Sequence, residues 1–166
     1  TAELFENRWT ILSPSSEADP SDIKKVSDLW ESIGSKVKIM SATDHDKILS
    51  LTSHLPHVIA YNIVKTTMDN NEKLKTDIIR YSAGGLRDFT RIAASNPTMW
   101  KDIFIDNSDL IVDAINNFSR NLEEFKKIIA EKDGKKLLSI FEKAKESREA
   151  VIKAGQDTDK PNFGRK

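Results

Sequence analysis

The side chains with the greatest capacity for chemistry lie in one segment. The three histidines of the chain occupy positions 45, 54 and 57. On one continuous helix, at about 100° per residue, a polar stripe would cover about a third of the circumference and include Asp46, Ser50, Ser53, His54, His57 and Tyr61. The core side would carry Leu49, Thr52, Ile59 and Ile63. Hydroxyls, imidazoles and a phenol on one face can bind a polar ligand; the alternative is a face that only meets solvent.

A second polar group follows the pair Gly84–Gly85. Asp88 and Arg91 stand three residues apart, so a helix places them on one face. A carboxylate at that spacing can orient the guanidinium for bidentate capture of a carboxylate or phosphate, and a glycine pair lets backbone approach a ligand closely. Such ion pairs also commonly only decorate a surface. Trp100 either walls a pocket or fills a core, and a core position is the simpler expectation.

Two sharper enzyme motifs do not fit this chain. His45–Asp46 is the kind of pair that metal-dependent phosphohydrolases use, but the further His and Asp ligands at set positions are missing, so we expect no metal site. The six glycines lack the spacing of a dinucleotide-binding fingerprint after a strand. No cofactor site is visible in this chain by itself.

Composition limits the classes of protein to consider. The 166 residues suffice for one domain, or one domain with a fragment of a neighbour. Lys plus Arg and Asp plus Glu both number 26, and this balance argues against a nucleic-acid partner. The chain has no cysteine, no apolar run long enough to span a membrane and no signal-peptide pattern. We therefore expect a cytoplasmic protein without nucleic-acid or membrane partners.

Local patterns predict a short mixed segment followed by helices. A strand is expected at 9–12, a helix from Asp19–Pro20 to Gly34, and a strand at 37–40. This βαβ unit needs further strands on which to pack. Because the chain also opens without a methionine, we interpret the unit as the end of an α/β domain whose earlier part is missing.

From Thr43 onward the expected structure is helical. One run covers 43–69 with a kink near residues 53–55, because Pro56 removes a backbone donor. A shorter helix at 73–82 is expected to end at Gly84–Gly85, and another covers 87–94.

Two long helices close the expected fold, and the tail 155–166 is predicted to be disordered. The first carries an apolar seam at spacings of four and three, made of Ile111, Ile115, Phe118, Leu122, Phe125 and Ile129. After Asp133–Gly134, the second carries Leu137, Phe141, Ala144 and Val151 on one face. Such a pair suits dimerisation; the alternative is that the seam only covers the chain's own core.

Three motifs in order carry a family resemblance. They are Ser53-His54-Leu55-Pro56-His57, the stretch from Gly84 to Ala93, and Asn96-Pro97-Thr98-Met99-Trp100. Together they resemble the C-terminal domain of the prephenate, arogenate and cyclohexadienyl dehydrogenases. The resemblance reaches back to Leu4–Phe5 and forward over the two long helices, and only the tail after about Ala154 falls outside it. Leu86 and Ala83 depart mildly from the family pattern.

The resemblance implies an enzyme of tyrosine biosynthesis. Its reaction is the NAD(P)-dependent oxidative decarboxylation of prephenate to 4-hydroxyphenylpyruvate, with arogenate as an alternative substrate and tyrosine as a candidate inhibitor. NAD or NADP would be bound mainly by a missing N-terminal domain, which would also hold the family's catalytic histidine. No catalytic residue is therefore assigned here, and the chain alone is expected to be inactive.

The resemblance also implies substrate-binding roles for named residues. Arg91 matches the arginine that binds a substrate carboxylate, His57 matches a substrate-side histidine, and Asp88 belongs to the network holding that arginine. The weaker candidates are His54, Ser53, Gly85, Arg87 and Trp100.

The implied fold is mainly α, a helical dimerisation domain of the 6-phosphogluconate-dehydrogenase-like type preceded by a short βαβ remnant of a Rossmann domain. We place the remnant at residues 1–42 and the substrate-binding, dimerising domain at 43–154, with a homodimer formed through helices 108–154. The alternative is a non-catalytic helical module that only dimerises or binds a partner.

Overall fold

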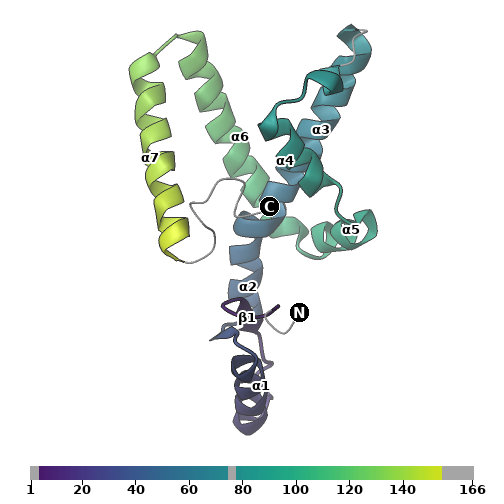
Figure 1. Cartoon of the computed structure of the whole chain (residues 1–166), viewed down its shortest axis with the longest axis vertical. Coiled ribbons are helices and arrows are strands. Elements are labelled where there is room, and N and C mark those ends of the chain that lie inside the picture. Colours follow the sequence, from purple (N-terminus) through teal and green to yellow (C-terminus); the bar gives the residue numbers. More distant parts are fainter. Residues whose placement is uncertain (1–3, 75–77, 155–166) are drawn as a thin grey trace. The chain divides into compact units, whose positions relative to one another are not determined.

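The computed structural model describes residues 4–74 and 78–154 of the chain. The predicted disordered tail 155–166 and the middle of the helix expected over 73–82 lie outside these residues. The described residues form two compact units: one holds those up to Leu12, Glu17–Lys38 and those from Phe118 onward, and the other holds Ser13–Ser16 and Ile39–Asn117. Most of the described chain is helical, as the sequence predicted (Figure 1).

The strand–helix–strand prediction is confirmed. Strands β1 (Trp9–Leu12) and β2 (Lys36–Ile39) pair in a two-stranded parallel sheet, connected by α1 (Pro20–Ser32). The Asp19 side chain accepts a hydrogen bond from the Ser21 N–H at 2.7 Å and caps the helix where expected.

Gly34 ends the α1 segment for a steric reason. Its φ of +92° lies in the left-handed region that favours glycine. A Cβ at this position would also lie 3.1 Å from the Cα of Glu6. The Gly34 carbonyl accepts a hydrogen bond from the Asn7 N–H at 2.8 Å, so this close approach ties the N-terminal segment to the end of the helix.

The second unit is built from short helices around α3. Helix α2 (Ala42–Leu49) leads through a turn at Ser50–His54 into α3 (Leu55–Leu74). Helix α4 (Gly84–Ala93) packs on α3, and α5 (Pro97–Asp106) follows it (Figure 1). The start of α5 is capped by Asn96, whose side chain accepts from the Thr98 and Met99 N–H groups.

The boundaries predicted between residues 69 and 87 are wrong, and α3, expected to end at 69, continues to Leu74. Gly84–Gly85 begins α4 instead of ending the helix before it, and Ile78–Tyr81 is a short 3₁₀ turn, not part of a helix over 73–82. Glycine is a poor helix former but is tolerated in a first turn, where few intrahelical hydrogen bonds depend on it. The sequence pattern counted the pair only as a stop signal.

The two long helices form where predicted. Helix α6 (Ser108–Ala130) and helix α7 (Gly134–Lys153) lie side by side and run in opposite directions beyond Phe118 (Figure 1). Phe125 and Phe141 stack across this hairpin with ring centroids 6.3 Å apart. Asp133 caps α7 by accepting from the Lys136 N–H at 3.0 Å.

The expected apolar seam of α6 is correct only in part. Ile111 is buried and Phe125 is half-buried, but Leu122 and Ile129 are exposed, and Ile128 is the fully buried residue near the helix end. A strict spacing of four and three predicts one straight stripe of buried residues along the helix. The residues that are in fact buried are those that face neighbouring elements. The exposed seam residues are therefore free to contact something outside this chain.

Candidate functional site

The helix through the histidine segment changes its pitch at Ser50–His54. These five residues form a π-helical turn, in which the Leu55 N–H donates to the Ser50 carbonyl. Pro56 follows immediately and has no N–H with which to continue the α-helical pattern. Such single wide turns inside helices are frequent at functional sites. The break predicted beside Pro56 is confirmed, and it takes the form of one extra residue in the turn.

The wide turn changes which side chains are buried. Ser50 and His54 are buried, whereas Leu51 and Thr52 are exposed. The expected division, with Thr52 on the core side and the histidine side open to a ligand, is therefore wrong at this turn. A pattern that assumes one continuous α-helix cannot predict this burial, because the inserted residue rotates α3 relative to α2.

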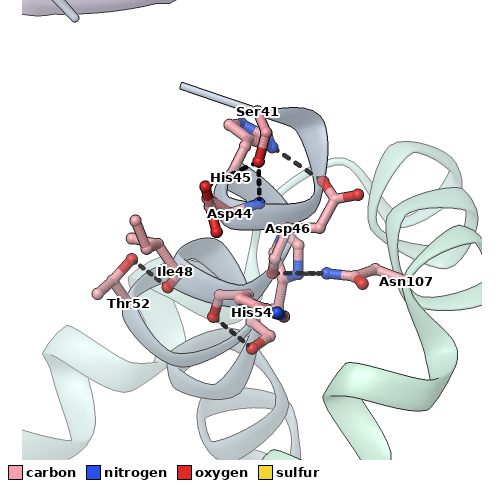
Figure 2. Close-up of polar contacts among 10 residues, drawn as sticks. Ser41, Asp44, His45, Asp46, Ile48, Thr52, His54 and Asn107 are labelled. Carbon is pink, nitrogen blue, oxygen red and sulfur yellow. Dashed lines mark hydrogen bonds and ion pairs between the residues drawn. The ribbon is translucent and has the colours of Figure 1, made fainter. Parts of the chain in front are cut away.

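His54 lies in a packed polar environment. Its Nδ1 is 3.2 Å from the Nδ2 of Asn107, which also donates to the Asp46 carbonyl at 3.1 Å (Figure 2). The Trp100 ring and the imidazole meet edge to face, with ring centroids 6.2 Å apart. Burial lowers the pKa of His54 from its usual value; the charge of Asp46 opposes this shift, and His45 and His57 add to it. The ring is accordingly neutral at neutral pH.

His57 is fixed by its own backbone and by Trp100. Its Nδ1 lies 2.9 Å from the Ser53 carbonyl oxygen, so Nδ1 is the donor in that contact. The ring stacks on Trp100 with centroids 3.5 Å apart and planes 20° from parallel. Trp100 is only 7 % exposed, as expected for a core position, yet it lies directly against the predicted site residue His57.

Two buried polar atoms near the histidines lack partners. Trp100 Nε1 and Tyr61 Oη have no hydrogen bond within the described ranges. A buried polar group without a partner costs about 1–3 kcal/mol, so such groups require a structural or functional reason. The Tyr61 side chain also lines an open, mostly apolar hollow of about 590 Å³ between residues of α3, α5 and α6.

His45 is engaged within its own helix. Its Nδ1 lies 2.9 Å from Asp46 Oδ1. Among the described residues, no three His, Asp or Glu side chains are grouped so as to hold a metal ion.

The Asp88–Arg91 pair lies on α4 and is open to solvent. Arg91 Nη2 and Asp88 Oδ1 are 3.5 Å apart, and each side chain is 53 % exposed. Arg87 is also exposed, and a Cβ added at Gly85 would meet no heavy atom within 4 Å. The ion pair expected from the spacing is therefore present, and both of its side chains are accessible from solvent.

The predicted site residues thus form two groups. In the first, the histidine cluster, Trp100 contacts both His54 and His57, and Ser53 contributes its carbonyl. Asp88 with Arg91 forms the second group. In the part of the chain that the structure describes, no hydrogen bond or ion pair joins Arg91 to either histidine. Asn107 was missed, because an asparagine at a helix boundary normally indicates only a turn, and its partner His54 is 53 residues away.

Comparison with known proteins identifies the family. Residues 41–143 match the family model described as the prephenate dehydrogenase dimerization domain. The chain belongs to the prephenate dehydrogenase family. The match covers α2 to the first part of α7, and so includes both groups of predicted site residues.

Individual relatives support the assignment of this chain to the prephenate dehydrogenase family. The chain is 41% identical over 150 residues to a cyclohexadienyl dehydrogenase of Zymomonas mobilis, covering 90% of this chain and 51% of the relative. It is 34% identical over 148 residues to a prephenate dehydrogenase of Bacillus subtilis, covering 89% and 40%.

A solved structure supports the same assignment. The prephenate dehydrogenase of A. aeolicus, in complex with hydroxyphenyl propionate and NAD+, superposes with a TM-score of 0.83 at 34% identity. The superposition covers 90% of this chain and 52% of that one. The chain thus spans about half the length, or less, of the relatives it matches. None of the helices in the described ranges has the length and apolar character needed to cross a membrane.

Proposed function

We propose that this chain supplies the substrate-binding and dimerising part of a prephenate dehydrogenase. The complete enzyme would oxidise and decarboxylate prephenate to 4-hydroxyphenylpyruvate in tyrosine biosynthesis. The observation that carries the proposal is the family match over residues 41–143, which includes the histidine cluster and the Asp88–Arg91 pair. A structurally similar relative is in complex with hydroxyphenyl propionate and NAD+, which supports as the ligand a ring whose side chain ends in a carboxylate.

The chemistry divides between a cofactor and the residues of this chain. A bound nicotinamide cofactor would supply the hydride acceptor, for a reaction in which loss of carbon dioxide makes the ring aromatic. The prediction from the resemblance is NAD or NADP, and the A. aeolicus structure, which contains NAD+, supports NAD. This chain shows no glycine fingerprint, so we assign the cofactor to residues outside it. The residues here would hold the ring and its carboxylates in place.

Arg91 is the proposed anchor for a substrate carboxylate. It is an exposed guanidinium, and Asp88 at 3.5 Å restricts its orientation. Planar bidentate pairing makes arginine suited to carboxylates. His57 is the proposed second contact, because its fixed Nδ1–H leaves Nε2 available to the ligand. Ser53, His54, Gly85, Arg87 and Trp100 stay as weaker predictions for the same site, and so do arogenate as the substrate and tyrosine as an inhibitor.

The test uses the intact protein that contains this chain. Initial rates of NADH formation would be measured with prephenate and with arogenate, for the native protein and for Arg91→Ala. Loss of one charged hydrogen-bond partner costs about 1.5–3 kcal/mol, which corresponds to a KM raised on the order of 10- to 100-fold. Unchanged kinetics with both substrates would remove Arg91 from the site.

Lys25→Ala is the matched control for this substitution. Lys25 also pairs with an aspartate three residues away, Asp22, and is also exposed, but it lies on α1. Its KM should equal that of the native protein. An equal rise in both variants would indicate a general electrostatic effect and contradict the assignment of Arg91.

We also propose that α6 and α7 pair with a second copy of the chain. The matched family model is a dimerization domain. Large apolar side chains remain exposed on α7 and on the part of α6 beyond Phe118, and a helix pair that exposes several of them suits an interface with a second copy: Leu122, Ile129, Leu138, Phe141 and Val151.

A charge placed in this surface tests the pairing. Phe141→Asp should shift the protein from dimer to monomer in sedimentation velocity, because a buried unpaired carboxylate is costly. Lys145→Asp, on the same helix, is the control and should leave the dimer intact. A dimer that persists in Phe141→Asp would place the interface elsewhere. A stable dimer with no turnover or binding of prephenate or arogenate would instead favour the non-catalytic module.

A further inference from the structure

Asn107 connects two parts of the site that are distant in sequence. It lies between α5 and α6, and its side chain reaches the region where α2 meets the π-helical turn (Figure 2). The amide nitrogen Nδ2 lies 3.1 Å from the Asp46 carbonyl oxygen and 3.2 Å from His54 Nδ1. Both hydrogens of one NH₂ group thus have a partner.

The Asp46 carbonyl fixes the orientation of this amide. A backbone carbonyl can only accept, so the Asn107 atom facing it must be the nitrogen and not the oxygen. The same nitrogen faces His54 Nδ1, which must therefore be an acceptor and carry no hydrogen. A neutral imidazole has one N–H, so the hydrogen of His54 is on Nε2.

The neighbouring ionisable groups do not offer an alternative partner to Nδ1. The Asp46 carboxylate is engaged by His45 Nδ1 at 2.9 Å, and it is the backbone oxygen of Asp46 that meets Asn107. The hydrogen bond found for the His54 ring among the described residues is the one at Nδ1, and the residue is 7 % exposed. The Nε2–H of His54, which the contact with Asn107 determines, is thus the donor that the ring can offer to a ligand.

His57 is held in the opposite state. Its Nδ1 donates to the Ser53 carbonyl, so the neutral ring carries its hydrogen on Nδ1 and presents Nε2 as an acceptor. Two histidines three residues apart, both in contact with Trp100, therefore differ in which ring nitrogen is protonated.

We propose that Asn107 is a positioning residue that holds His54 as the neutral Nε2–H tautomer, so that the site offers a fixed donor at His54 beside an acceptor at His57. This pattern fits a ligand that bears an acceptor oxygen, such as a carboxylate, and a hydroxyl. The tautomer assignment stands on the geometry alone, and only its role in substrate binding rests on the proposed function.

The test is nitrogen NMR of the full chain labelled with ¹⁵N-histidine, at neutral pH and without ligand. Native His54 should show a protonated Nε2 and an unprotonated Nδ1, and His57 the reverse. In Asn107→Asp a carboxylate faces Nδ1, so the hydrogen of His54 should move to Nδ1 while His57 stays unchanged. Asn116→Asp, which adds the same charge to an exposed position on α6, should change neither ring.

Asn107→Ala provides a second variant in case Asn107→Asp does not fold, as judged by circular dichroism. Removal of the donor should give His54 a mixture of both tautomers. A native His54 that carries its hydrogen on Nδ1, or a pure Nε2–H form that persists in Asn107→Ala, would overturn the proposal. Because no substrate is present, these outcomes do not depend on the activity.

The role in binding has a separate readout. In the intact protein, Asn107→Ala should raise KM for the substrate about 10-fold, as expected for loss of one fixed hydrogen-bond donor, and Asn116→Asp should not. A tautomer change without any change in KM would contradict the proposed role of Asn107 in substrate binding. Lack of turnover in the native protein would sink the proposed function instead.

Discussion

The histidine cluster and the Asp88–Arg91 pair lie in the same unit but are held in different ways. His54 and Trp100 are buried, and their positions depend on contacts among the π-helical turn, α5 and Asn107, which lies between α5 and α6. Asp88 and Arg91 extend from one helix into solvent and depend mainly on each other. Changes in the cluster should therefore affect folding and binding together, whereas changes in the pair should affect binding alone.

The largest effect is expected at Trp100. Trp100→Ala removes a buried ring that touches His54, His57 and Phe104, and should lower the free energy of unfolding by about 3–5 kcal/mol. Urea denaturation followed by circular dichroism measures the loss. Trp9→Ala, which removes a half-exposed ring on β1, should cost far less. Equal losses would show that Trp100 does not organise the cluster.

A smaller effect should come from the protonation of His54. Burial lowers its folded-state pKa below the ordinary value of 6.5, so the unfolded chain binds a proton more readily. The free energy of unfolding should therefore fall as pH drops below about 6.5 and level off below the folded-state pKa. Urea midpoints measured over this range in native protein and in His54→Gln would show it, because the variant should lose part of the slope.

His45→Gln is the reference for that pH series. His45 is partly exposed and bonded to Asp46, so its removal should not remove the slope assigned to burial of His54. If His54→Gln keeps the full pH dependence of the native chain, another group is responsible.

The smallest effect on stability is expected at Asp88. Exposed ion pairs contribute about 0–1 kcal/mol, so Asp88→Ala should leave the urea midpoint almost unchanged. The same variant should weaken substrate binding, because Arg91 loses the group that orients it. Asp102→Ala removes another exposed partner, that of Lys101, and serves as the comparison for both measurements. A large loss of stability in Asp88→Ala would mean that the pair supports the fold.

Local signals predicted most element boundaries. Asp19–Pro20 begins a helix and Gly34 ends one, both as expected, and the interruption expected at Asp133–Gly134 falls where α7 begins. These signals succeed because the capping residue lies within a few positions of the backbone groups that it satisfies. The family was likewise predictable, because its three motifs are contiguous in the sequence.

Features that depend on distant residues or on a change in helix pitch were not predictable. The π-helical turn at Ser50–His54 reverses the expected burial of Thr52 and His54, since periodicity assumes one pitch throughout. The partner of His54 lies 53 residues ahead, at Asn107, and no local pattern connects them. The glycine pair at 84–85 was predicted to end a helix, whereas it begins α4, which packs on α3; a local stop signal contains no information about that tertiary contact.

Because of the extra residue in the π-helical turn, this segment should not accept changes in its length. Deletion of one residue between Ser50 and His54 would restore a continuous α-helix and rotate α3 by about 100° relative to α2. His57 and Tyr61 would then leave Trp100 and Phe104, although every side chain of the cluster would still be encoded. Insertions and deletions in this segment should thus be far rarer among functional variants than substitutions.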